Sequence, residues 1–174
     1  MTSDIKQSFL NLARYNKRVN REMYEVLAVL TDRARKQETG SWFRSIHGIL
    51  NHLIICDHNW LKRYRSLSPE SLVLKDPRLD PPNLSWDHDL HDDFADLWED
   101  RKIVDEIIHS WFREFPASRY DEAFNYQDSG GNDRHATAGS AFEFLFLLFG
   151  LLFFFLFLLF LLLPSFCLQL SLFL

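Results

Sequence analysis

The sequence predicts an all-α protein, a four-helix bundle with a small β-hairpin before the last helix. Three amphipathic segments with helical periodicity lie before Pro116, and each is long enough for a bundle helix. Turn-forming residues then separate two short extended pieces, and helical character resumes near Gly139. Three amphipathic helices leave an apolar groove between them, so the architecture requires a fourth helix to cover it.

The first predicted helix begins after Ser3, whose hydroxyl can cap an amide of the first turn. Its apolar positions are spaced alternately by four and three residues, the pattern of a packed helix pair. Asn16 fills the one gap in this stripe, so we expect its amide to be buried and to need a hydrogen-bond partner. The stripe consists of Ile5, Phe9, Leu12, Val19, Met23, Val26 and Leu30.

The second predicted helix follows a break at residues 39–41 and carries its own apolar stripe. Asp57 occupies a position within that stripe, and a buried carboxylate must be paired, hydrogen-bonded or protonated. Arg101, in the middle of the third segment's stripe, is the candidate partner. The second stripe consists of Phe43, Ile46, Leu50, Leu53, Trp60, Tyr64 and Leu67.

Residues 68–85 contain four of the six prolines and are predicted to form a long crossover loop. A third helix is predicted from near Ser85 to about Phe115, where a proline follows. We expect four aspartates in its first turns, where the helix dipole favours negative charge. We interpret these acids, together with His88 and His91, as capping and solvated groups rather than as a metal cluster. The aspartates are Asp87, Asp89, Asp92 and Asp93.

A hairpin is predicted after the third helix. Residues 120–127 alternate weakly between polar and apolar side chains. Residues 128–133, with the sequence DSGGND, are strong turn formers, and residues 134–137 form a second extended piece. The two pieces are therefore expected to pair before the last helix.

The composition argues against several function classes. A net charge of −5 and a pI near 5.8 leave no electrostatic footprint for a polyanion, and with no local cluster of basic residues apparent we expect no nucleic-acid partner. Cys56 and Cys167 form neither a C-x-x-C motif nor a secreted disulfide pattern. The N-terminal residues lack the apolar stretch of a signal peptide, so the expected compartment is the cytoplasm.

Residues 45–60, SIHGILNHLIICDHNW, carry the clearest functional signal. His52 lies on an otherwise apolar helix and is followed by Asp57 and Trp60. Helix bundles use inward-facing imidazoles of this kind to hold metals. The run H-L-x-x-x-D-x-x-W, together with A-R-Y-N at residues 13–16, resembles the DinB family of small metalloenzymes over roughly residues 5–143.

The resemblance implies a DinB-like four-helix bundle with a divalent metal, Zn, Ni, Fe or Mn, held by three histidines. His52 corresponds to the first of these ligands. The other two form an H-x-x-x-H pair on the family's last helix, which aligns near Leu151 and Phe155, and no histidine follows His135 in this chain. Known activities in the family are thiol-dependent transferases or isomerases, and other members are described as metal-dependent hydrolases. The resemblance therefore implies a thiol or other small-molecule substrate, and we predict that this copy is impaired.

Other side chains offer only partial substitutes for the missing pair. Cys56 lies four residues after His52 on the same helix face, where a thiolate and an imidazole make half of a metal site. The alternative is a buried cysteine that acts as a small hydrophobe. His47 and His58 are about 16 Å apart along a helix and cannot bind one ion together. His109 is isolated among apolar residues and is expected to cap or hydrogen-bond.

Residues 144–174 form an apolar tail in place of the fourth helix and are distinct from the predicted bundle of residues 1–143. All 19 basic and 24 acidic side chains lie at or before Glu143, and residues 144–163 contain only Phe, Leu and Gly150. At about 1.5 Å per residue this run spans about 30 Å, the thickness of a bilayer core. A tail-anchored membrane interaction protein without catalysis is therefore the alternative to an enzyme.

Two further interpretations of the tail stay open. Phe, Leu, Ser and Pro are the residues that codons made only of pyrimidines encode, which favours translated low-complexity sequence from a frameshift or a read-through intron. A diverged fourth helix is the remaining interpretation. A homodimer formed through the bundle faces is a further expectation for partners.

Overall fold

The computed structural model describes residues 2–40, 42–82, 84–86 and 88–146, with side chains from residue 4 onward. The helices are α1 (Thr2–Ala28), α2 (Asp32–Arg35), α3 (Ile46–Tyr64) and α4 (Phe94–Glu114), with short 3-10 helices η1 (Pro77–Leu79) and η2 (Ala117–Arg119). The strands are β1 (Ala123–Gln127) and β2 (Asp133–Thr137). Residues 138–146 are the described part of the last helix.

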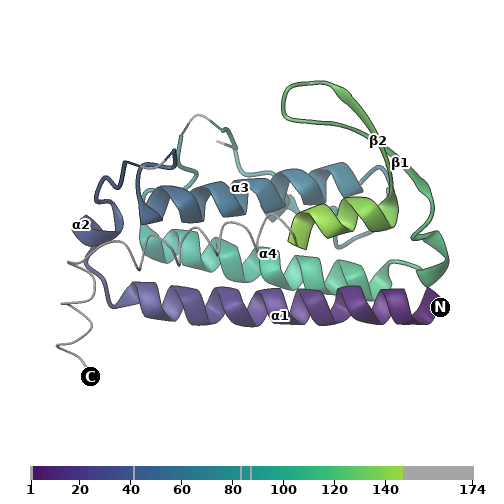
Figure 1. Ribbon diagram of the computed structural model, residues 1–174, viewed down its shortest axis with the longest axis horizontal. Helices are drawn as coiled ribbons and strands as arrows, with labels where there is room; N and C mark the ends of the chain where they lie inside the picture. Colours follow the sequence, from purple (N-terminus) through teal and green to yellow (C-terminus); the bar gives the residue numbers. More distant parts are fainter. Residues whose placement is uncertain (1, 41, 83, 87, 147–174) are drawn as a thin grey trace.

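The long helices lie side by side, with α4 between α1 and α3 (Figure 1). In Figure 1 the last helix lies in front of α3 and α4 and runs roughly along them, and the hairpin precedes it in the chain. The described residues therefore form a mostly helical bundle with one small antiparallel hairpin before the last helix. This arrangement confirms the predicted fold class.

Phe142, on the last helix, is the centre of the core. It has no exposed surface and meets six aromatic rings at centroid distances of 4.9–5.7 Å, all nearly perpendicular to its own. The Tyr64 hydroxyl also donates a hydrogen bond of 3.0 Å to the carbonyl of Ala141. These contacts join the last helix to the rest of the bundle. The six rings belong to Phe9, Tyr64, Trp111, Phe112, Phe115 and Tyr120.

A buried ion network crosses the interface between α3 and α4. Arg101 donates to Asp57 at 2.5 Å and lies 2.8 Å from Asp105, which confirms the expected pairing of Asp57 with Arg101. Asn20 of α1 donates to Asp105 at 2.8 Å. Asn16 is buried as expected, but its Oδ1 has no hydrogen-bond partner among the described residues.

The prediction that the third long helix starts near Ser85 was wrong, because α4 begins at Phe94. The Asp93 carboxylate caps this start by accepting hydrogen bonds from two amides of the first turn. Just before it, the backbone amide of His91 donates to the side chain of Asn51 on α3, which holds this segment in a loop. Asp92 therefore precedes the helix and pairs with Lys36 at 2.9 Å.

The structure contains the predicted hairpin, with its turn between β1 and β2. Phe124 pairs with Ala136 in its antiparallel register and is buried. At the tip, the Asp128 carboxylate accepts hydrogen bonds from the amides of Gly130 and Asn132 at 2.9 and 3.0 Å. In Figure 1 the hairpin extends over the C-terminal part of α3.

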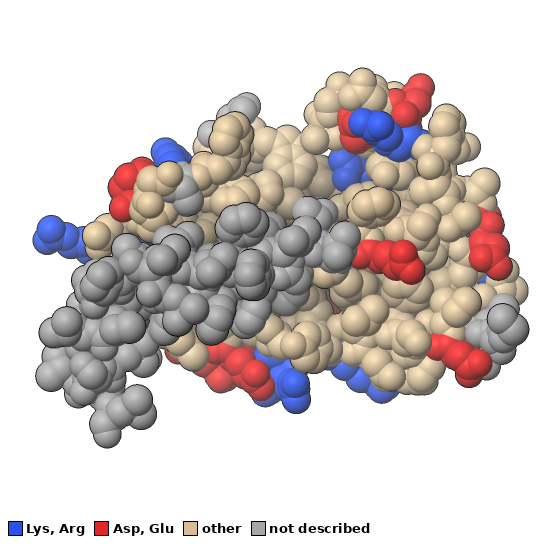
Figure 2. Space-filling model, viewed as in Figure 1, with Lys and Arg blue, Asp and Glu red and all other residues tan. Residues whose placement is uncertain are grey.

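In the view of Figure 2, charged side chains lie mostly around the edge of the described surface. Within the residues that the structure describes, no helix is long and apolar enough to cross a membrane. Most of the apolar run at 144–163 lies outside these residues, as do the alignment positions Leu151 and Phe155. The boundary predicted at residue 143 falls within the last helix, which continues at least to residue 146.

Candidate functional site

His52 is half-buried on one face of α3, in a hollow of about 240 Å³ between α3 and two loops. Its ring lies 4.6 Å from the ring of Phe43 and 5.6 Å from that of Trp86. Gly48 allows the first of these loops to close on the helix, because a Cβ there would lie 2.2 Å from the carbonyl oxygen of Phe43. The predicted ligand therefore lies in an aromatic hollow.

Cys56 is the neighbour of His52 with ligand chemistry, and its Sγ lies 3.4 Å from Nε2 of the imidazole. Burial lowers the pKa of His52, which keeps the ring neutral at pH 7. Burial, reinforced by the nearby carboxylate of Asp57, raises the pKa of the Cys56 thiol to about 12. The sulfur is therefore a protonated thiol at pH 7, and a metal would have to displace this proton to bind it.

The described residues do not fit a complete metal centre. Among them, no group of three or more His, Cys, Asp or Glu side chains is arranged to hold an ion. His52 and Cys56 supply two donors. The role of His52 as a metal ligand stays a prediction.

Two histidines contact Asp100 of α4 and form with it the Asp100 cluster, which the sequence did not indicate. Nε2 of His58, a fully buried side chain on α3, lies 3.1 Å from the carboxylate, and Nε2 of His91 lies 2.7 Å from it. His47 contacts the carbonyl oxygen of His91 at 2.8 Å instead. His47 and His58 thus have separate hydrogen-bond partners.

The backbone of His91 is hydrogen-bonded, as is its side chain. Asn51 donates to its carbonyl oxygen at 3.0 Å and accepts from its amide at 2.9 Å. The loop before α4 is therefore joined to α3 through the backbone of His91 and to α4 through its imidazole. His91 was expected to be a capping or solvated group, but its contacts with Asn51 and Asp100 are tertiary, and its side chain is only 24% exposed.

Replacing Asp100 with asparagine is expected to destabilise the fold by about 1–3 kcal/mol at neutral pH, because it removes the anion between two imidazoles. Although burial opposes ionisation, the hydrogen bonds from His58 and His91 outweigh it and hold the pKa of Asp100 well below its usual value. A carboxyl group whose pKa falls on folding stabilises the protein above its unfolded pKa, near 4, and loses this effect as the pH falls. Urea unfolding should therefore show the difference between wild type and variant shrinking below about pH 4.

The α1–α4 interface holds a basic hollow of about 580 Å³, lined in part by His109. Nε2 of His109 is buried without a hydrogen-bond partner among the described residues, contrary to our expectation for this side chain. The net charge of −5 is summed over the whole chain and therefore does not reveal this local cluster. On α1, the basic residues recur on one face at helical spacing. The basic side chains that line the hollow are Arg14, Lys17, Arg18, Arg21, Arg101 and Lys102.

Together, the helical bundle, the hairpin before the last helix and the histidine-bearing face of α3 define a small helical-bundle protein with a histidine in a hollow. The DinB family model matches residues 1–133, well over half of the 174 residues, and the chain belongs to the DinB family. The matched region includes His52 and the Asp100 cluster. Comparisons with curated proteins and with solved structures give no match.

Proposed function

We propose that this chain is a DinB-family protein in which the divalent-metal chemistry of the family is weak or lost. The observation that supports the proposal is the donor set: His52 lies beside Cys56, and no histidine follows His135 in the sequence to supply the family's H-x-x-x-H pair. No third donor completes the site within the described ranges. The hollow around His52 offers a place for a small-molecule or thiol substrate.

Without a metal, the hollow offers limited chemistry. The neutral imidazole of His52 can accept a hydrogen bond from a thiol or hydroxyl group, and the rings of Phe43 and Trp86 provide apolar contact. Cys56 is poorly suited to act as a nucleophile, because its pKa of about 12 leaves almost no thiolate at pH 7. These groups support binding better than they support transferase or hydrolase catalysis.

The test is metal retention by the purified full-length chain. After incubation with Zn²⁺ or Ni²⁺ and gel filtration, we expect well under one equivalent of metal per chain, measured by elemental analysis. His52→Ala should change this little, and His135→Ala, which removes a histidine of the hairpin, serves as the matched control. Retention of one tightly bound equivalent that disappears in His52→Ala but not in His135→Ala would contradict the proposal.

A further inference from the structure

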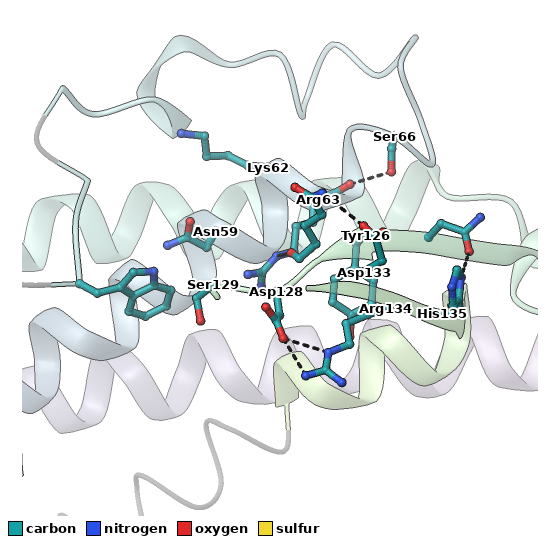
Figure 3. Close-up of a pocket in the computed structure, with 13 residues that line it drawn as sticks. Asn59, Lys62, Arg63, Ser66, Tyr126, Asp128, Ser129, Asp133, Arg134 and His135 are labelled. Carbon is teal, nitrogen blue, oxygen red and sulfur yellow. Dashed lines mark hydrogen bonds and ion pairs between the residues drawn. The ribbon is translucent and has the colours of Figure 1, made fainter. Parts of the chain in front are cut away.

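A polar cleft of about 870 Å³ separates the C-terminal half of α3 from the hairpin. Figure 3 shows its side chains, with Lys62 and Arg63 coming from α3 and Arg134 from β2. Both strands and the turn between them contribute to one wall, and α3 forms the other. Trp86, from the long crossover loop, also lines the cleft.

Arg63 differs from the other cations of the cleft in having no carboxylate partner among the described residues. Arg134 lies 2.7 Å from Asp128, and Lys62 lies 3.2 Å from Asp80. Arg63 instead donates from Nε to the carbonyl of Gln127 at 2.9 Å. Among the described residues, the charge of Arg63 therefore has no carboxylate within 4 Å.

The guanidinium of Arg63 is also preorganised. It lies 4.9 Å from the ring centre of Trp60 and 5.7 Å from that of Tyr126, and both rings stabilise a cation held in this position. Nε donates to the hairpin backbone, and neither terminal nitrogen has a hydrogen-bond partner among the described residues, which leaves both for a ligand. A guanidinium held in this way suits the two oxygens of a carboxylate or phosphate group.

The cleft adjoins the hollow of His52. Trp86 lines both, and its side chain is 44% exposed. On α3, His52, Asn59 and Arg63 are spaced by seven and four residues, which places them along one helix face. A ligand whose anionic group lies at Arg63 can therefore extend along α3 towards His52, with its body against Trp86.

We propose that this cleft binds a small organic oxyanion, a carboxylate or phosphate monoester on a planar apolar body. Arg63 binds the anionic group, and Trp86 contacts the apolar body. This site requires no metal and goes beyond the function proposed above, so the two can fail separately. The basic hollow between α1 and α4 is the weaker candidate, because four of its surface cations already lie within 4 Å of a carboxylate.

The test is calorimetric titration of the purified full-length chain with phenyl phosphate and, separately, with phenylacetate. We expect one ligand per chain for at least one of the two, and the tighter ligand identifies the preferred anion. Arg63→Gln should weaken binding at least about tenfold, since it removes the charge and the paired donors. Arg63→Lys, which keeps the charge without the fork, should fall between the wild type and Arg63→Gln.

Controls separate binding from folding. Arg21→Gln removes a cation from the α1–α4 hollow and should leave the affinity within about twofold, as should His52→Ala. Substituting Arg63 also removes a contact with the hairpin backbone, so Trp86→Ala provides a second variant. It should weaken the binding of phenyl phosphate but leave the affinity for inorganic phosphate unchanged. Failure of both aromatic anions to bind at millimolar concentration would overturn the proposal. Unchanged binding in Arg63→Gln, or loss of binding in Arg21→Gln, would overturn it as well.

Discussion

Replacing Phe142 with alanine is expected to lower the free energy of unfolding by about 3–5 kcal/mol, the cost of deleting a large buried aromatic side chain. The expectation rests on the complete burial of Phe142 and on its six ring contacts. The neighbouring rings come from α1, α3, α4 and the segment before the hairpin, so no single element can move to fill the cavity. Urea unfolding monitored by circular dichroism provides the measurement.

Phe144, on the same helix, is the matched control. It is 47% exposed, and its one ring contact among the described residues is a stack on Trp60 at 6.3 Å. Phe144→Ala should therefore cost less than about 1 kcal/mol. Equal effects of the two substitutions would show that the last helix does not pack through Phe142 as described.

Replacing Arg101 with methionine is expected to cost about 3–5 kcal/mol, because it leaves two buried carboxylates without their shared cation. Asp57 and Asp105 are almost fully buried, and both contact the guanidinium. Burial already raises the pKa of Asp105 to about 6 and also raises that of Asp57, while Arg101 opposes both shifts. Without Arg101, each of the two carboxyl groups must either be protonated or remain a buried negative charge with no cation beside it.

The pH dependence distinguishes this mechanism from simple loss of packing. In the variant, the folded state binds more protons than the unfolded state over the interval between the raised folded pKa values and about 4. The stability of Arg101→Met should consequently rise as the pH is lowered from 7 to 5, which urea unfolding at each pH would show. Arg18→Met, which breaks an exposed pair with Glu22, should cost less than about 1 kcal/mol at every pH. A loss in Arg101→Met that does not change with pH would contradict the electrostatic explanation.

Much of the bundle could be predicted from sequence, because apolar periodicity reports which face of a helix is buried. Asp57 and Arg101 each interrupt such a stripe, so their pairing followed from the need to compensate buried charges of opposite sign. The turn residues between β1 and β2 predicted the hairpin through local backbone preferences alone. His52 was placed on a helix face by the same periodicity, and its position beside Cys56 follows from their spacing of four residues.

Tertiary structure alone decided which loop and hairpin residues meet α3. His91 lies 33 residues after His58 in the chain, and no local pattern indicates that both reach Asp100. In the sequence, Arg63 likewise cannot be distinguished from other surface cations. In the structure, a carbonyl and an aromatic ring of the hairpin hold its guanidinium in place. The physical reason is that periodicity and turn chemistry act over a few neighbouring residues, whereas these sites depend on the path of the chain between distant elements. The sequence by itself determined the helices and their buried faces, and the tertiary structure determined the Asp100 cluster and the cleft at Arg63.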